Sequence, residues 1–463
     1  MIKKIFVLII TGLIVSRGFV SAQQRLWSLE ECIKYAIDNN IQIKQQVLQT
    51  KYQKNALDLA RLKLLPTLNG QATHNYSFGR ALDETTYQFT EQENVQSNNF
   101  YLGGSLNIFN GLQNINSIKK NRYELLASDE DLKNIRDNVA LNVALGYLQV
   151  LLNKELVTAT AGQLDITRQQ IEKTKRMVNA GSVPRGNLLQ IEAQAAQEEL
   201  QLISIKNQLD ISVLNLTQLL ELKSPEGFDI VTPEIHVDTN TVITGNINDI
   251  YEAALLTRPE IKSSEYRLTS SEYDLKIAQG GRSPRLSLNH SFSTGYSSIR
   301  QRIIGIDPVT GPVYGKYNFA DQLNDNINYG VGFSLSIPIL NNWQVNKNIS
   351  NTKLSIENSE YALEGAKKQL YKNIQQAYAD AVAALKKYGA SIKAVVSMEE
   401  SFRYTEQRFN VGMITPVDYN SAKTQLLNAQ SDLAQAKYEF IFKTKVLDFY
   451  KGIPIKLDKT INF

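Results

Sequence analysis

Few residues in this chain have the types and spacing that metal or enzymatic chemistry requires. The three histidines, His74, His236 and His290, are far apart, and none lies at helical spacing from another histidine, a cysteine or a glutamate. Metal sites in proteins need several such ligands in register. No nucleophile elbow or dinucleotide fingerprint occurs either. The sequence therefore predicts no metal, no cofactor and no enzyme activity.

One glycine pair has the spacing of a phosphate-binding loop. Gly181 and Gly186 match that spacing, but Asn187 and Leu188 replace the lysine and the serine or threonine that hold phosphate and Mg²⁺. A turn between two helices explains these glycines better, because glycine accepts a positive φ at little cost.

A second turn of this kind is predicted late in the chain. Gly412-Met413 stands where Gly181-Ser182 stands in the first half, and Thr415-Pro416 then opens a helix. Asp418 follows in the first helical turn, where the helix dipole favours an acid. From the residues alone, Asp418 is predicted to be a helix-end carboxylate.

The first 22 residues indicate the compartment. Lys3 and Lys4 precede a short apolar run over residues 5–14, and Val20-Ser21-Ala22 resembles a cleavage site. This pattern predicts a secretory signal peptide over residues 1–22, and the run is too short for a membrane helix. The alternative interpretation of this apolar run is a buried N-terminal helix.

Composition excludes several other classes. Removing the signal peptide takes away three basic residues and reduces the formal charge from +4 to +1, so nucleic acid is not a predicted partner. The single cysteine, Cys32, can form no intrachain disulfide. No later window has the roughly 18 apolar residues of a membrane helix. A chain of this kind can cross a membrane only as a closed β-barrel.

The mature sequence reads as two similar halves, about 28–222 and 248–450. Gly181 and Gly412 are 231 residues apart, and so are Gly111-Leu112-Gln113 and Asn342-Trp343-Gln344. Upstream, Pro66 and Pro284 are only 218 apart, which is what a loop insertion in the second half would give. We interpret the pattern as an internal duplication.

Most of each half carries a seven-residue apolar repeat. The repeated positions are Val143, Val150, Val157, Leu164, Ile171 and Val178, and then Ile374, Ala381, Tyr388, Val395, Phe402 and Phe409. Such heptads predict helices packed side by side as coiled coils. The first stripe, 113–178, contains no proline and would extend on the order of 100 Å as one helix.

Four segments alternate with a period of two, over residues 68–79, 99–109, 285–296 and 328–337. One set of positions is apolar, as in Phe100, Leu102, Leu106, Leu286, Leu288, Phe292, Tyr329, Val331, Phe333 and Leu335. The positions between them are mostly serine, asparagine and glycine. This pattern is typical of strands in a membrane barrel with a polar interior. A water-soluble sandwich with one solvated face is the alternative.

Four strands are too few to close a barrel. Known membrane barrels begin at about eight strands, and an open edge in lipid leaves backbone groups unpaired. Eight strands leave an interior filled by side chains. A conducting pore therefore favours three copies and twelve strands.

At this point the layout resembles the TolC-like outer-membrane efflux protein family. The resemblance covers about residues 28–450 and rests on the duplication and on ordered local motifs. These motifs are Leu65-Pro66-Thr67-Leu68, Ser105–Gly111, Asn179–Pro184 and Asn410–Asp418. It implies an α+β membrane protein, a homotrimer with four transmembrane strands per chain and a tunnel of long antiparallel helices.

The resemblance also implies a domain layout. The expected parts are a signal peptide (1–22), repeat 1 (23–222, β-hairpin about 67–109), an equatorial linker (223–247), repeat 2 (248–450, β-hairpin about 285–339) and a C-terminal tail (451–463).

Function and partners follow from the same resemblance. It implies an exit duct in the cell outer membrane, with its helices in the periplasm, that serves a tripartite efflux or type I secretion system. The partners would be a periplasmic adaptor, an inner-membrane pump and outer-membrane lipid. Gly181, Ser182, Gly412 and Met413 would form the adaptor-docking tips.

The family often narrows its tunnel with acidic residues after the second tip. Asp418, with Phe409 and Arg408, is expected at such a constriction. Ser421 and Asn187 stand where further acids could be, so each subunit would contribute one carboxylate.

Two other functions compete with the duct. A secreted trimeric coiled-coil adhesin or fibre would explain the heptads but not the duplicated strand hairpins. A periplasmic binding module would need no apolar outer strand face.

Overall fold

The computed structural model describes residues 26–83, 87–89, 93–233, 236–237, 246–457 and 460–461. The predicted signal peptide lies outside these residues. The chain divides into two compact units. The first consists of Met1–Leu48, Asp129–Lys262 and Glu364–Phe463, and the second of Gln49–Ser128 and Ser263–Leu363.

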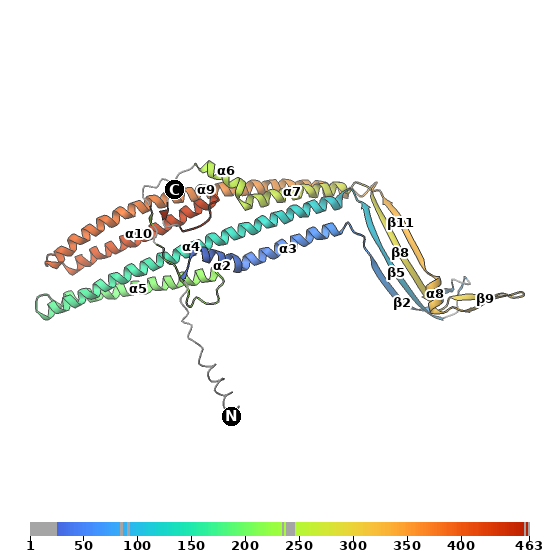
Figure 1. Cartoon of the computed structure of the whole chain (residues 1–463), viewed down its shortest axis with the longest axis horizontal. Helices are drawn as coiled ribbons and strands as arrows, with labels where there is room; N and C mark the ends of the chain where they lie inside the picture. Colours follow the sequence, from blue (N-terminus) through green and yellow to red (C-terminus); the bar gives the residue numbers. More distant parts are fainter. Residues whose placement is uncertain are drawn as a thin grey trace, which may run out of the picture. The chain divides into compact units, whose positions relative to one another are not determined.

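The helices recur with equal lengths in the two halves (Figure 1). The pairs are α2 (Leu29–Asn39) with α6 (Ile247–Thr257), α3 (Ile41–Leu62) with α7 (Pro259–Gly280), α4 (Gln113–Asn179) with α9 (Gln344–Asn410), and α5 (Arg185–Leu219) with α10 (Pro416–Tyr450). The members of each pair have 11, 22, 67 and 35 residues, respectively. This agreement confirms the predicted duplication.

The predicted heptad stripes are the inward faces of these helices. Val143, Val150 and Leu164 are buried in α4, as are Ile374, Ala381 and Tyr388 in α9. Within the described chain, no helix carries an apolar stretch long enough to cross a membrane.

A four-stranded antiparallel sheet lies in the second unit, in the order β11-β8-β5-β2 (Figure 1). Its strands are β2 (Asn69–Gly79), β5 (Glu93–Phe109), β8 (Arg285–Ser297) and β11 (Asn328–Ser336). β5 begins six residues earlier than expected, because Asn94 to Asn98 continue to pair with β2. β2 and β11 are the edges, and neither has an outer partner strand among the described residues.

The strand register confirms that the sheet has two different faces. Leu102 lies opposite Phe292, which lies opposite Tyr329, and Leu106 lies opposite Leu288, which lies opposite Phe333. The neighbouring rows, on the other face, are Gly103, Ser291 and Gly330, and Ser105, Asn289 and Gly332. One face is therefore apolar and the other is small and polar.

The strand-to-helix corners repeat as well. Gly111 and Leu112 have φ of 67° and 61°, and Asn342 and Trp343 have φ of 49° and 62°. Two successive residues in this left-handed region form a tight turn before α4 and before α9, closed by bonds from the Gln113 N–H to the Asn110 carbonyl and from the Gln344 N–H to the Asn341 carbonyl. The matched Gly111-Leu112 and Asn342-Trp343 motifs thus mark the same backbone shape.

The connections at the far end of the sheet differ between the halves. β2 and β5 are joined through the short strands β3 (Leu82–Asp83) and β4 (Gln88–Phe89). β8 and β11 are joined through β9 (Gln301–Asp307), β10 (Gly311–Lys316) and α8 (Phe319–Asp325). This longer connection is the insertion that the change in offset predicted.

The first unit has its own core around the middle of α4. Tyr147 and Leu151 of α4, Leu216 of α5, Ile441 of α10 and Cys32 of α2 are all buried there. The Tyr147 hydroxyl donates to the Val231 carbonyl oxygen (2.7 Å) and also lies 3.2 Å from the Trp27 carbonyl oxygen.

Two short parallel strand pairs also occur in the first unit, and the first of them borders this core through Trp27 and Ile230. β1 (Leu26–Trp27) pairs with β6 (Asp229–Ile230), and β7 (His236–Val237) pairs with β12 (Thr460–Ile461). The predicted linker, 223–247, and tail, 451–463, are therefore joined to each other through β7 and β12.

Candidate channel surfaces and helical tips

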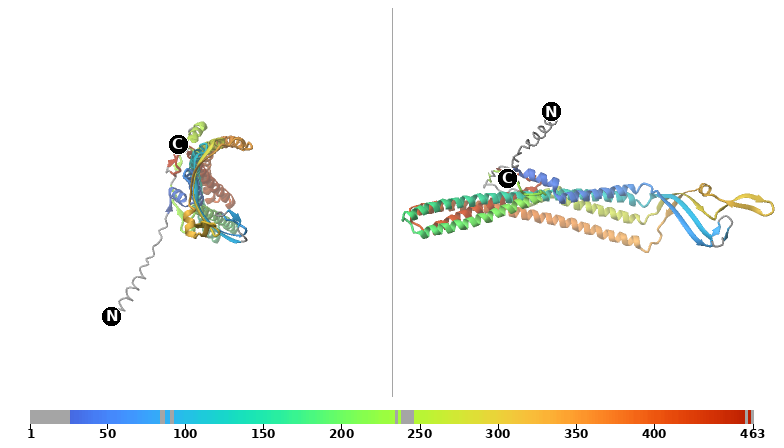
Figure 2. Two further views of the ribbon diagram at one scale, coloured as in Figure 1. Left: turned by 90° about the vertical axis from the view of Figure 1, so that its right-hand side faces the viewer. Right: turned by 90° about the horizontal axis from the view of Figure 1, so that it is seen from below.

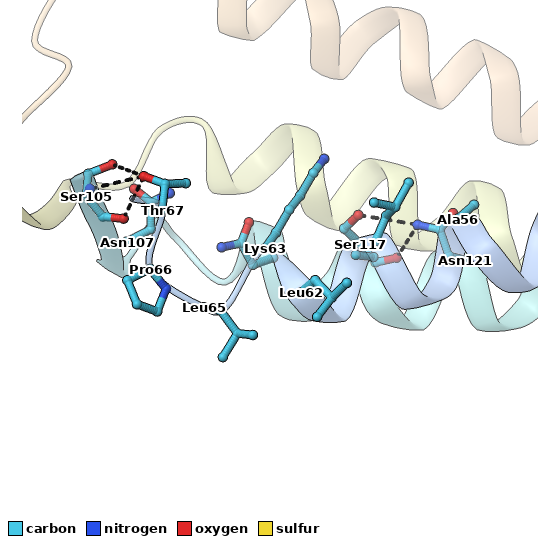
Figure 3. Close-up of a pocket in the computed structure, with 13 residues that line it drawn as sticks. Ala56, Leu62, Lys63, Leu65, Pro66, Thr67, Ser105, Asn107, Ser117 and Asn121 are labelled. Atoms are coloured by element: carbon cyan, nitrogen blue, oxygen red, sulfur yellow. Dashed lines mark hydrogen bonds between the residues drawn. The ribbon is translucent and has the colours of Figure 1, made fainter. Parts of the chain in front are cut away.

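The motif Leu65-Pro66-Thr67-Leu68, which leads into β2, sets the register of the sheet in the second unit (Figure 3). Thr67 follows Pro66, and its N–H donates to the Ser105 carbonyl oxygen at 2.9 Å. The Ser105 N–H donates in turn to Thr67 Oγ1 at 3.1 Å. These bonds fix β2 beside β5 at the end where α3 and α4 meet the sheet, next to an open recess of about 720 Å³.

The first helical tip is a Schellman turn at the end of α4. The Gly181 N–H donates to the Val178 carbonyl (2.9 Å) and the Ser182 N–H to the Met177 carbonyl (2.9 Å). Gly181 has φ of +75°, the left-handed conformation that such turns require. Ser182 Oγ adds a second bond to the Met177 carbonyl at 2.9 Å.

The second tip repeats this geometry at the end of α9. The Gly412 N–H donates to the Phe409 carbonyl (3.0 Å) and the Met413 N–H to the Arg408 carbonyl (2.9 Å), with Gly412 at φ +77°. Gly181, Gly412 and Met413 are exposed. Both predicted turns thus lie where long antiparallel helices meet (Figure 2).

Asp418 lies in the first turn of α10 and forms a capping box with Thr415, the N-cap residue. Its N–H donates to Thr415 Oγ1 (3.2 Å), and its Oδ2 accepts from the Thr415 N–H (3.3 Å) and hydroxyl (2.7 Å). This reciprocal capping box confirms the predicted helix-end role. The Asp418 side chain is otherwise exposed to solvent.

A cleft of about 280 Å³ separates the two tips within the first unit. Ser182 borders it from one side, and Phe409 and Gly412 border it from the other. Phe409 also stacks on Tyr419 with ring centroids 4.5 Å apart, which holds α9 against α10. The predicted site residues thus fall into those that line the cleft and those that do not. The second group is Arg408, Asp418, Gly181 and Met413.

Sequence reasoning missed a buried polar cluster between α4, α5 and α10. Lys423 of α10 and Glu198 of α5 have side chains only 2% and 7% exposed, with Nζ and Oε1 3.5 Å apart. Lys423 Nζ also donates to the Gln163 carbonyl of α4 at 3.1 Å, and the Thr167 hydroxyl contacts both charged groups. Burial lowers the pKa of Lys423, whereas the Glu198 carboxylate raises it. This cluster ties α10 to α4 and α5.

One sequence signal could have indicated this seam. Asn153, Thr160, Thr167 and Thr174 are seven residues apart, and all four are buried. They form a polar heptad stripe beside the apolar one. A search for heptads of apolar residues alone does not detect this polar stripe.

Comparisons with known proteins agree with this architecture. A family model described as Outer membrane efflux protein matches residues 32–221 and 250–442. Outer membrane protein TolC of Escherichia coli (strain K12) is 23% identical over 444 residues, covering 94% of this chain and 83% of TolC. Alkaline protease secretion protein AprF of Pseudomonas aeruginosa is 21% identical and covers 90% of this chain and 83% of its own.

A solved structure of CusC, described in connection with transmembrane channel formation, has a TM-score of 0.76 at 16% identity. The match covers 92% of each chain. The fold is therefore that of a channel protein with long helices and a four-stranded sheet. Because the family model covers most of both repeats, this chain belongs to the outer membrane efflux protein family and is an outer-membrane channel with its helical part in the periplasm.

Proposed function

We propose that three copies of this chain form one exit duct, which passes solutes or proteins delivered by a periplasmic adaptor and an inner-membrane pump. The observation that carries the proposal is the sheet, with one apolar face, one polar face and two edges, β2 and β11, that have no outer partner strand in the described part of the chain. In lipid, each unpaired backbone group costs several kcal/mol, so these edges require strands from other copies.

The polar sheet face would then line a hydrated pore, and the apolar face would meet lipid. Both efflux and type I secretion fit this arrangement. AprF is named for the secretion of alkaline protease, which supports an exported protein as the alternative to a small solute.

The two tips are the proposed docking surface for the adaptor. Gly181, Ser182, Gly412 and Met413 are the first residues that a partner arriving end-on at these turns would meet. Their backbone N–H groups donate within the turns, and the Met413 side chain, 72% exposed, is available for contact.

The proposed constriction lies just beyond the second turn. Asp418 would contribute one carboxylate per copy to a ring of three, with Arg408 exposed nearby and Phe409 bracing the helix pair from inside. Three carboxylates at the narrowest point would attract cations and repel anions.

We expect Asp418→Asn to raise the anion permeability of the channel. Asparagine can still accept the Thr415 N–H bond, so the change removes the charge and retains most of the cap. Single-channel recordings in planar bilayers under a salt gradient measure the reversal potential. Asp418→Ala serves as the control that also removes the reciprocal bonds from Thr415 to the carboxylate, while Thr415 remains the N-cap.

An unchanged reversal potential in both variants would restrict Asp418 to its capping role. The absence of any conducting steps from the parent protein would instead contradict the proposed duct.

We expect Gly412→Val to impair export and to reduce adaptor cross-linking at the second tip. Nothing lies within 4 Å of a Cβ built at Gly412, so the cost comes from its φ of +77° alone, about 1–3 kcal/mol for a β-branched residue. Gly412→Asn is the matched control, because asparagine tolerates this region. Normal export by Gly412→Val would remove this turn from the docking surface.

A further inference from the structure

The connection between β8 and β11 forms an apolar hairpin with no role in the proposed duct. Ile303, Ile304 and Ile306 of β9 are 57%, 60% and 80% exposed, and Val309 at the turn is 92% exposed. A two-stranded hairpin is marginally stable in water by itself. An exposed apolar ribbon of this kind indicates a contact surface.

The base of this hairpin is firmly built. Gln322 of α8 is fully buried and donates to the carbonyl oxygens of Ser297 (3.0 Å) and Tyr317 (2.9 Å), while its Oε1 accepts from the Ser297 N–H (3.0 Å). Asn326 Nδ2 donates to the Gly295 carbonyl at 2.7 Å. The α8 segment is thereby fixed to the end of β8, from which the hairpin projects (Figure 2).

The turn of the hairpin is equally well defined. Asp307 Oδ1 accepts the N–H groups of Val309 (2.7 Å) and Thr310 (2.9 Å), and these bonds lower the pKa of Asp307. Gly311 closes the turn with φ of +87°. The apolar residues are therefore held on a shaped ribbon.

Strand order identifies which surface of a second copy would meet this ribbon. A ring that repeats the order β11-β8-β5-β2 places β2 of one copy beside β11 of the next. The β2–β5 connection lies at the same end of the sheet as the hairpin, because Ser97 pairs with Ser297 and Gly79 with Glu93. Each hairpin would then stand beside the β2–β5 connection of the adjacent copy.

The two surfaces are both apolar. The described part of the β2–β5 connection exposes Leu82 (45%), Tyr87 (81%) and Phe89 (66%). Contact between these side chains and the isoleucines of β9 would remove apolar surface of both copies from water.

We propose that the β9–β10 hairpin of each copy packs against Leu82, Tyr87 and Phe89, on and beside the short strands β3 and β4 of the adjacent copy, and stabilises the ring at the rim far from the helices. This inference rests on the proposed closure of the barrel by several copies. It adds an intersubunit contact beyond the pairing of edge strands.

Cysteine cross-linking between differently tagged chains tests the contact. One chain carries Ile306→Cys and a co-expressed chain carries Tyr87→Cys, so a product with both tags must join two copies. Native Cys32 does not interfere, because it is fully buried and its thiol pKa is raised to about 12. A short bismaleimide should give the doubly tagged product, whereas Ile306→Cys with Leu65→Cys, at the opposite end of the sheet, should not.

A second measurement gives the strength of the contact. Replacing residues 302–315 by a short Gly-Ser turn should lower the temperature at which the oligomer dissociates in detergent, and so should Tyr87→Ser with Phe89→Ser. Combining both changes should lower it no further than the larger single effect, because both remove one contact.

Three results would overturn this inference. They are cross-links only between two Ile306→Cys chains, no cross-link in an intact oligomer, or an unchanged dissociation temperature in the shortened variant. Each of them leaves the duct standing, whereas a parent protein that never oligomerises would remove the proposed function itself.

Discussion

Lys423→Met is expected to destabilise the helical part of the protein by about 3–5 kcal/mol, because Glu198 would stay buried without its counter-charge. The two side chains are 2% and 7% exposed, so little water is available to solvate the remaining carboxylate. The Thr167 hydroxyl and the Gln194 amide would remain as hydrogen-bond donors to that carboxylate, but neither carries a charge. Loss of helical circular dichroism against denaturant in detergent measures the change.

Two further variants make this result specific. Adding Glu198→Met to Lys423→Met should restore most of the stability, since the buried charge is then removed together with its partner. Lys387→Met breaks the Lys387–Glu439 pair (2.8 Å), whose side chains are 49% and 38% exposed, and should cost at most about 1 kcal/mol. Equal losses for Lys423→Met and Lys387→Met would show that the buried cluster does not hold these helices together.

Leu106→Arg is expected to reduce barrel stability by about 2–4 kcal/mol if it lies near the middle of the membrane. Leu106 lies in register with Leu288, and Leu288 with Phe333, on the apolar face. Asn107→Arg is the adjacent control, since Asn107 lies in register with Ser287, and Ser287 with Ser334, on the polar face. Unfolding of lipid-inserted protein by denaturant compares the two variants, and equal stability would mean that the faces have been assigned wrongly.

The regular parts of the fold were predictable because each repeats a simple period. Alternation assigned Leu102, Leu106, Phe292 and Phe333 to one face, and the strand register places them there. Heptads located the long helices, since one inward stripe must persist along each coiled coil. Gly181 and Gly412 marked both tips, because a turn of this geometry needs a positive φ.

Features that depend on partners distant in the sequence were not predictable. Lys423 is buried only because Glu198 and Thr167, more than 200 residues away, come to its side. The offset change revealed an insertion after β8, but the shape of that insertion depends on Gln322 reaching back to Ser297. The alternating pattern between 93 and 98 was too polar to mark the start of β5, which is set by pairing with β2.

The mass of the folded protein in detergent, corrected for bound detergent by light scattering, tests the central claim most directly. The free edges of β2 and β11 predict a particle with three times the mass of the processed chain. A stable, folded particle with the mass of a single chain would show that four strands suffice, and would contradict the proposed duct.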